Sequence, residues 1–325
     1  MGAPSARPLT STSPQSLGPV YAGLILQVLI SAGTYLAGKR AMSELAPLTV
    51  VLWRFVLSGS VFMLLLCFLP GPRLPPRNEW GRVLLLGLLA GPVNQVFFFY
   101  GLSQSTAAHA ALLYALTPLG VYLLSLGRGH ERASLRAMGG IITAFAGVVV
   151  LLLGRGLADA SGSLMGDLLI LGAVMSWVVY TTEGKPFVAI HGPIRATSWS
   201  MVASTLMMML MAPFFAKPEA VLAASSAARY SIVYLGLLTS VVAYLLWYFA
   251  LSRVPASKVA VFSNLQPAAT ALAAWAILDE ALHWEIAVGG VLVLLGVRLT
   301  QAAHVRSPAA APAVPERPPA SSSVG

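Results

Sequence analysis

The sequence predicts an all-α polytopic membrane protein, with ten transmembrane helices arranged as two inverted five-helix repeats. Three observations carry this prediction: an apolar composition, long apolar segments separated by short polar breaks, and residues that recur between the two halves. Of the 325 residues, 57% are hydrophobic and only 10% are charged, whereas soluble domains carry roughly 25% charged residues. So little charge cannot cover a water-exposed surface, which argues strongly against a soluble enzyme.

Ten apolar segments lie between two tails, residues 1–19 and 301–325, which are rich in Pro, Ser and Ala and are expected to be disordered. A spanning helix needs about 20 mainly apolar residues, so the fifth and tenth segments are marginal, and eight or nine spans is the alternative count. The runs are continuously apolar rather than alternating, which argues against a transmembrane β-barrel. The segments are 20–38, 48–69, 83–102, 107–126, 137–153, 164–182, 197–215, 230–251, 256–278 and 284–299.

Charge predicts the orientation and the partners. The net charge of +9 would favour nucleic acid in a soluble protein, but here it is read along the membrane normal. Most basic residues outside the segments fall on the side of the two termini, which predicts that both termini are cytoplasmic in the cytoplasmic membrane. The expected partners are the lipid bilayer and a small-molecule substrate, with no nucleic acid; the oligomeric state stays open. The single cysteine, Cys67, excludes a multi-cysteine metal site or disulfides.

The second half of the chain repeats the first. Each repeat, 20–153 and 164–300, would hold five helices, an odd number, so the two copies cross the membrane in opposite senses. Inverted repeats are typical of secondary transporters, whose substrate sites lie at the repeat interface near mid-bilayer; the alternative is a duplication without consequence for activity. At one constant offset the matches are Leu102-Ser103 with Leu251-Ser252, Pro118 with Pro267, Glu131 with Glu280, Gly140 with Gly289 and Gly147 with Gly296, and at a slightly shorter offset Lys39 with Lys185, Pro47 with Pro193 and Trp53 with Trp199.

These residues resemble the EamA-type drug/metabolite transporters. The resemblance covers roughly residues 20–300 and implies two inverted five-helix bundles that export or exchange small metabolites such as amino acids. In the first helix, Gly33-Thr34-Tyr35 stands where the family commonly has Trp-Gly. The resemblance rests on Gly101-Leu102-Ser103 through Pro118, Glu131 and Gly147 with their repeats, on Pro47 and Trp53-Arg54, and on Ser176-Trp177 and Lys185.

Two matched prolines, Pro118 and Pro267, predict the substrate cavity. A proline inside a helix cannot donate its amide and clashes with the carbonyl four residues earlier, which would free the carbonyls of Tyr114 and Ser263. Paired interruptions in the two halves of a transporter point to its binding site; a kink that serves packing alone is the alternative. The neutral hydrogen-bonding neighbours are Thr117, Asn264 and Gln266.

Polar and aromatic residues in other segments extend this cavity. A cavity with aromatic walls and a few amide or hydroxyl groups suits a zwitterionic or aromatic metabolite. For any one aromatic, lipid contact or a place in an interfacial belt is the alternative. The candidates are Asn94 and Gln95 after Gly91-Pro92, Trp177 and Tyr180 in the sixth segment, and Tyr244 and Trp247 in the eighth.

Arg54 is the one charge well inside a predicted span, where insertion costs roughly 2.5–3.5 kcal/mol. The family carries an arginine at the matching place, which implies gating or the binding of a carboxylate. Structural pairing is the alternative, and Glu44, Asp279 and Glu280 lie on the same side of the membrane to provide it.

His109 and Lys258 match between the repeats, near the starts of the fourth and ninth helices, and are assigned to gating or charge. Asp167 and Glu285 lie at segment ends, so no carboxylate is expected deep in a helix and a relay of Asp/Glu type has no candidate. If protons drive transport, His109 is the group that could titrate near neutrality.

The sequence therefore predicts a secondary transporter that works by alternating access and exports or exchanges a small metabolite, for example an amino acid. One alternative keeps the fold and carries a nucleotide sugar or a cationic drug, and another is a membrane-embedded enzyme or a non-transporting scaffold. No phosphate-binding glycine loop, His-Glu-x-x-His or nucleophile elbow occurs in the chain. We therefore expect no enzyme, no metal site and no cofactor.

Overall fold

The computed structural model describes residues 18–127, 135–153, 160–215, 217, 219–251, 253, 262, 265–280 and 283–304. Within these ranges every regular element is helical and no strand is present. Among the described residues, six helical segments are long and apolar enough to cross a membrane, and they run from Gly18 to Met42, Pro47 to Phe68, Arg77 to Gln104, Ala107 to Leu124, Leu164 to His191 and Ser226 to Ala250. The chain is thus a helical protein with several candidate spans, while the count of ten stays a prediction.

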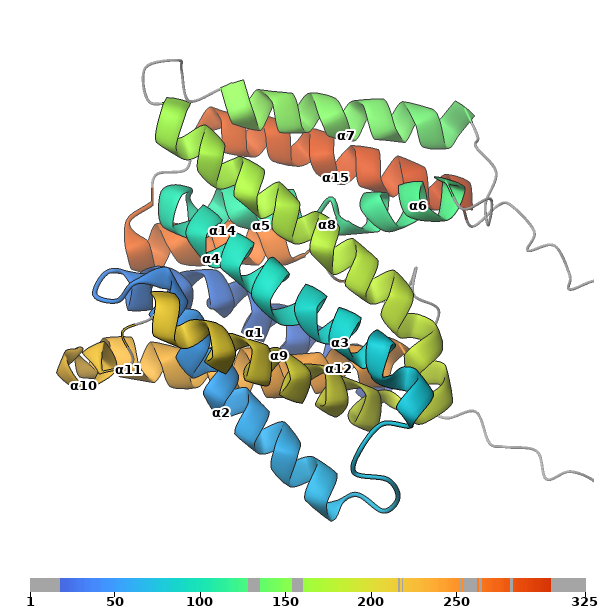
Figure 1. Cartoon of the computed structure of the whole chain (residues 1–325). Helices are drawn as coiled ribbons and strands as arrows, with labels where there is room; N and C mark the ends of the chain where they lie inside the picture. Colours follow the sequence, from blue (N-terminus) through green and yellow to red (C-terminus); the bar gives the residue numbers. More distant parts are fainter. Residues whose placement is uncertain are drawn as a thin grey trace, which may run out of the picture.

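The helices follow the order of the predicted segments (Figure 1), with a 3-10 turn at η1 and π-helical turns at η2 and η3. They are α1 (Gly18–Met42), α2 (Pro47–Phe68), η1 (Arg77–Glu79), α3 (Trp80–Leu88), η2 (Leu89–Val93), α4 (Asn94–Gln104), α5 (Ala107–Tyr114), α6 (Thr117–Gly127), α7 (Leu135–Leu153), α8 (Ala160–His191), α9 (Pro193–Phe215), α10 (Ala220–Ala223), α11 (Ser226–Val233), η3 (Tyr234–Val242), α12 (Ala243–Leu251), α14 (Gln266–Leu278) and α15 (Trp284–His304).

Local sequence explains where several helices begin and end. Proline opens α2 and α9, at the first helical turn where its missing amide is not needed. The side chains of Thr106 and Ser225 cap α5 and α11 by accepting from the amides of His109 and Ala228, each at 3.2 Å. Helix α8 continues to His191, well beyond the predicted end at residue 182, and stops at Gly192, whose φ of +78° suits glycine.

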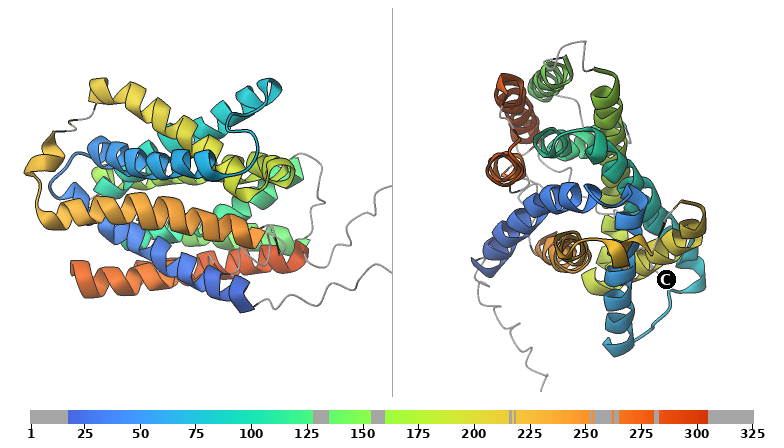
Figure 2. Two further views of the ribbon diagram at one scale, coloured as in Figure 1. Left: turned by 90° about the horizontal axis from the view of Figure 1, so that it is seen from below. Right: turned by 90° about the vertical axis from the view of Figure 1, so that its left-hand side faces the viewer.

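Packing brings together elements from the two halves of the chain. Helix α7 lies beside α15, α2 beside α9, and α4 beside α8 (Figures 1 and 2). Helix α1 packs against α12 and α14, and α5 against α8 and α14. The first turns of α1 and the last turns of α15 lie at the same end of the bundle, as the left view of Figure 2 shows. We call this the terminal end and the other the opposite end.

Helices α7 and α15 approach so closely that their backbones touch. A Cβ atom on Gly296 would lie 2.3 Å from the amide nitrogen of Ala144 and 2.5 Å from the carbonyl oxygen of Gly140. One on Gly147 would lie 2.7 Å from the carbonyl oxygen of Gly289. Higher numbers in one helix meet lower numbers in the other, so the two helices run antiparallel. Only glycine permits this approach at both contacts.

The matched prolines of the two halves lie at the starts of α6 and α14. Helices α5 and α6 are separated by Ala115 and Leu116, and Thr117-Pro118 opens α6. In the other half Leu265 is a turn and Gln266-Pro267 opens α14. Each proline therefore lies in the first turn of a helix, where proline is tolerated, and Pro118 follows a break between two helices rather than kinking a continuous one.

Candidate functional site

A buried arginine occupies the middle of the bundle. Arg54 of α2 is 4% exposed. Its Nε donates to Oγ of Ser240 in η3 at 2.6 Å, and its Nη1 donates to Oε1 of Gln95 in α4 at 2.6 Å. The guanidinium carbon lies 5.8 Å from the centre of the Phe99 ring, within the range of a cation–π contact. No carboxylate in the described ranges forms an ion pair with Arg54.

The π-helical turns help to place the partners of Arg54. In η3 the hydroxyl of Ser240 also donates to the carbonyl oxygen of Leu235 at 2.9 Å. In η2, Pro92 removes an amide just before α4 begins with Asn94 and Gln95. Single π-helical turns inside α-helices often occur at functional sites. Both turns here lie next to residues that bond to Arg54 or to its amide partner.

Two amide side chains extend this network to two further helices. Nε2 of Gln95 donates to Oδ1 of Asn94 at 2.6 Å. Nδ2 of Asn94 donates to the hydroxyl of Tyr114 in α5 at 3.0 Å and to the carbonyl of Ala173 in α8 at 2.6 Å. A chain of neutral hydrogen-bonding groups therefore joins α2, α4, α5 and α8.

Helix α1 contributes Tyr35, a residue that sequence reasoning left out of the site. Its ring centre lies 5.4 Å from that of Phe98 and 6.5 Å from that of Tyr114. Its hydroxyl accepts from Nε2 of Gln266, at the start of α14, at 3.2 Å. The departure from the family pattern in Gly33-Thr34-Tyr35 was the signal that could have found it.

A second aromatic group lies between α8 and α12. The ring centre of Trp177 lies 5.2 Å from that of Tyr180 and 5.4 Å from that of Tyr244. Tyr180 in turn lies 6.4 Å from Tyr248, which sequence reasoning did not select. Tyr180 and Tyr248 also line a small pocket with residues of α8 and α9.

Most of the described predicted site residues fall into two groups. Arg54, Asn94, Gln95 and Tyr114 form one network, which we call the central network, and Trp177, Tyr180 and Tyr244 form the aromatic group. Trp247 also packs against α1 residues Val20 and Leu24. Thr117 and Pro118 open α6, Gln266 and Pro267 open α14, and the predictions at Lys258, Ser263 and Asn264 lie outside the described residues.

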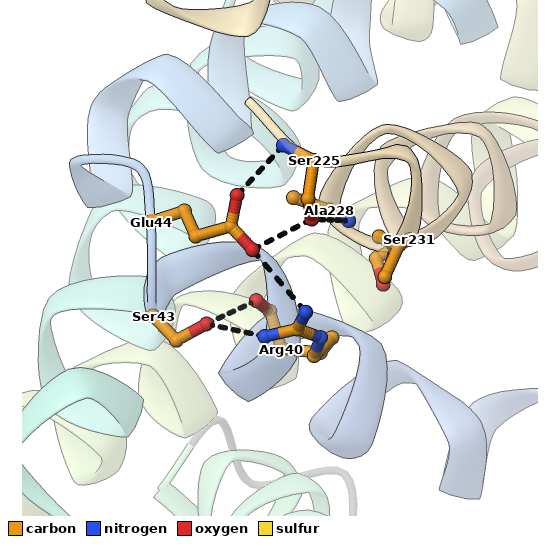
Figure 3. Close-up of polar contacts among 7 residues, drawn as sticks. Arg40, Ser43, Glu44, Ser225, Ala228 and Ser231 are labelled. Atoms are coloured by element: carbon orange, nitrogen blue, oxygen red, sulfur yellow. Dashed lines mark hydrogen bonds and ion pairs between the residues drawn. The ribbon is translucent and has the colours of Figure 1, made fainter. Parts of the chain in front are cut away.

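The alternative in which Arg54 pairs with Glu44, Asp279 or Glu280 is not seen: none of the three forms an ion pair with Arg54 among the described residues. Glu44 accepts from the amide and the hydroxyl of Ser225, both at 2.7 Å, and lies 3.2 Å from Nη2 of Arg40 (Figure 3). These hydrogen bonds from Ser225 are the main cause that lowers the pKa of Glu44.

The other two carboxylates also lie at a helix end. Both carboxylate oxygens of Glu280 accept from the amide of Ala107, at 3.0 and 3.2 Å, and Nζ of Lys39 lies 3.9 Å away. Asp279 ends α14 with a φ of +53°. Free amides at a helix N-terminus attract carboxylates, which keeps Glu44 and Glu280 at the opposite end of the bundle.

Asp167, which was expected at a segment end, is a buried carboxylate near the start of α8. Asp167 lies two turns after the start of α8 and is 1% exposed. Its Oδ2 lies 3.5 Å from Nδ1 of His109 in α5, and its Oδ1 accepts from the hydroxyl of Ser105. Sequence reasoning had selected His109 without a partner.

Comparisons with known proteins agree with this architecture. The profile of the EamA-like transporter family matches residues 18–153 and 164–301. An "Uncharacterized transporter" of Archaeoglobus fulgidus is 31% identical over 288 residues, which cover 86% of this chain and 96% of that protein. The "Uncharacterized transporter YyaM" of Bacillus subtilis is 27% identical over 293 residues, 89% of this chain and 95% of that protein.

One solved crystal structure is similar in fold, with a TM-score of 0.62 at 21% identity over 86% of this chain and 98% of that chain. The match of the family profile to both halves confirms the resemblance inferred from the sequence. This chain belongs to the EamA-like transporter family.

Proposed function

We propose that this chain is a secondary transporter of ten spans that exports or exchanges a small metabolite with a carboxylate, such as an amino acid, by alternating access. The central network forms its substrate site. Membership of a transporter family and the multiple apolar helices support the transport itself. Packing between the two halves supports the inverted repeat, and the environment of Arg54 supports the substrate class.

The contacts between α7 and α15 support inverted repeats. The offset that matches Gly140 with Gly289 also matches Gly147 with Gly296. The close contacts are Gly147 with Gly289 and Gly296 with Gly140, so exchanging the two halves maps each contact onto the other. Two equivalent helices that pack antiparallel in this way are related by an axis in the plane of the membrane, as inverted repeats require.

Other packing pairs follow the same exchange. The offset that matches Trp53 with Trp199 pairs Gly59 of α2 with Thr205 of α9, and a Cβ atom on Gly59 would lie 2.2 Å from Oγ1 of Thr205. The contact of α4 with α8 corresponds to that of α12 with α1, and the contact of α2 with η3 to that of α9 with α3. An axis between α2 and α9 accounts for these correspondences.

This symmetry supports an even number of spans with both chain ends on one side. The terminal end would then be cytoplasmic, because most basic residues outside the segments lie on that side. The opposite end, with the carboxylates of Glu44 and Glu280, would face outward.

The single observation that carries the substrate class is the environment of Arg54. A cation buried at mid-membrane is costly and normally pairs with an anion, yet its contacts here are the neutral Ser240 and Gln95 and the face of Phe99. A substrate carboxylate would supply the missing charge, and the arginine fork suits its geometry. The fixed positive charge disfavours a cationic drug, and one arginine offers little for the diphosphate of a nucleotide sugar.

Transport is tested by counterflow into proteoliposomes that hold the purified full-length chain. The panel comprises radiolabelled standard L-amino acids, a sugar nucleotide and a cationic dye. We expect exchange of one or more amino acids without chemical conversion. The α-amide of the same amino acid should compete at least about tenfold less well, since it lacks the charge that Arg54 would bind.

Three arginine variants sharpen the assignment. Arg54→Gln should abolish counterflow, and Arg54→Lys should retain part of it because it keeps the charge without the fork. Arg253→Gln is the matched control, because Arg253 is exposed and stacks on Phe249 at 3.6 Å. Equal competition by acid and amide, or counterflow in Arg54→Gln at the level of the control, would overturn the carboxylate assignment.

A further inference from the structure

A histidine and a carboxylate that the central network does not use meet inside the bundle. His109 of α5 and Asp167 of α8 are each 1% exposed. Nδ1 of His109 lies 3.5 Å from Oδ2 of Asp167 and forms no hydrogen bond to any described residue. Asp167 lies three residues inside the apolar segment that begins at Leu164. The pair therefore joins the two halves of the chain within the apolar layer, towards the opposite end.

The charge of such a pair depends on one proton. With one proton shared between the two groups the pair is neutral overall, as either imidazolium with carboxylate or imidazole with carboxylic acid. Loss of that proton leaves a buried carboxylate beside a neutral ring, and gain of a second leaves a buried imidazolium. Both changes place a net charge in a low-dielectric environment, which costs several kcal/mol in typical cases. The neutral state therefore favours the closed packing seen here.

We propose that His109 and Asp167 form the proton-binding site that couples this transporter to a proton gradient. Imidazole is the side chain that exchanges a proton near neutral pH. In the closed state the pair holds one proton, on either Nδ1 of His109 or Oδ2 of Asp167. When α5 and α8 separate at the opposite end, water reaches the pair and the proton passes to it. The hydroxyl of Ser105 then still donates to Oδ1 of Asp167 and helps to stabilise the carboxylate.

Charged groups also occur on the elements that pack against α5. Glu280 binds the amide of Ala107 and lies 3.9 Å from Lys39, at the start of the same helix α5. Glu285, 4% exposed, lies at the start of α15, which packs against α5. Helix α14, also packed against α5, carries no titratable residue between Gln266 and Leu278. The test therefore substitutes the pair itself.

The inference rests on the proposed transport function, and the test separates the two. Full-length protein is reconstituted in proteoliposomes, and the amino acid that gives counterflow is the probe. Counterflow without a gradient reports transport, and accumulation under an imposed pH gradient reports coupling. With one proton per substrate, a gradient of one pH unit supports accumulation of up to about tenfold in one gradient polarity. A pH dye trapped in the lumen should report proton movement on addition of the amino acid.

His109→Gln and Asp167→Asn should each retain counterflow while accumulation falls to the level without a gradient. His191→Gln is the matched control, because Nε2 of His191 lies 3.9 Å from Oε1 of Glu79 at the terminal end, and it should accumulate as the wild type does. Wild-type counterflow with neither accumulation nor a dye signal would overturn the coupling and leave the transport intact. Gradient-driven accumulation in both pair variants would overturn the assignment to this pair. If neither variant folds, the wild-type dye signal still tests the coupling, and its absence would overturn the proposal.

Discussion

The middle of the bundle and its opposite end treat charge in contrasting ways. In the middle, Arg54 is buried among Ser240, Gln95 and Phe99, and the described residues provide no anion. At the opposite end, Glu44 and Glu280 each bind the N-terminal amides of a helix and lie near a basic side chain. The carboxylates at the opposite end have basic partners, and the guanidinium of Arg54 in the middle has no anionic partner among the described residues. A charge without a counter-ion in the protein is available to a ligand, whereas a paired charge serves a structural contact.

Supplying the missing charge from the protein should break this contrast most strongly. Gln95→Glu places a carboxylate where Oε1 already lies 2.6 Å from Nη1 of Arg54. The new internal ion pair should compete with a substrate carboxylate and reduce counterflow about 100-fold, the factor that 2–3 kcal/mol represents. Unchanged thermal unfolding of the purified variant would show that the fold is intact. Full counterflow in Gln95→Glu would contradict the proposed role of Arg54.

The aromatic group should give the next largest effect. Trp177→Ala removes a ring that lies 5.2 and 5.4 Å from Tyr180 and Tyr244, and aromatic pairs contribute about 0.5–1.5 kcal/mol beyond burial. We expect a loss of flux of about tenfold with normal expression. Phe249→Ala, on the same helix as Tyr244, is the control. Wild-type flux in Trp177→Ala would remove this group from the site.

Gln266→Ala tests whether α14 contributes to the same site. The change removes the donor to the hydroxyl of Tyr35, at 3.2 Å, and a typical neutral hydrogen bond contributes about 0.5–1.5 kcal/mol. Flux should therefore fall severalfold, by about tenfold at most, with intact expression. Radiolabel counterflow measures it, and a variant that transports at the wild-type rate would exclude Gln266 from substrate binding.

At the opposite end a change should affect stability before flux. Glu280→Ala removes the acceptor of the Ala107 amide, and loss of a helix cap costs about 0.5–2 kcal/mol. We expect a lower unfolding temperature in detergent, with counterflow per folded molecule close to that of the wild type. Glu219→Ala at the exposed start of α10 should leave the unfolding temperature unchanged. A loss of flux without a loss of stability would place Glu280 in the transport cycle.

Glu44→Gln should give the smallest effect, and that effect should depend on pH. The hydrogen bonds from Ser225 lower the pKa of Glu44 in the folded state. A lowered folded pKa stabilises the protein above the unfolded value, about 4.3, and the stabilisation disappears as the pH falls through the folded value. Wild type should therefore unfold at a slightly higher temperature than Glu44→Gln at pH 7, and the difference should vanish in acid. A difference that grows on acidification would reverse the sign and contradict the contacts in Figure 3.

Features with a local physical cause could be predicted from the sequence. Pro118 marks the break between α5 and α6 because the ring excludes a continuous helix. Long apolar runs predicted membrane helices because a helix needs about 20 mainly apolar residues to span the bilayer. The buried amides Asn94 and Gln95 were also selected, since polar groups inside an apolar run need a partner.

Features that depend on contacts between distant segments could not be predicted. Asp167 and His109 come from helices far apart in sequence, and only packing of α5 against α8 shows that they meet. The π-helical turn around Ser240 has no proline to announce it. Glu44 and Glu280 were alternative partners for Arg54 because they share its side of the membrane, but amides at nearby helix starts compete for them. A single sequence without pairing information leaves such competition open.

The helix break after Tyr114 supplies a hydrogen-bond donor for the carbonyl that it frees. The hydroxyl of Thr117 donates to the carbonyl of Tyr114 at 2.7 Å, so this oxygen, which a continuous helix would have satisfied, keeps a partner within the same joint. A hinge that brings its own donor does not depend on solvent in order to exist inside lipid. The helix break can therefore exist in a dry interior, because the freed carbonyl oxygen needs no water or other new hydrogen-bond donor.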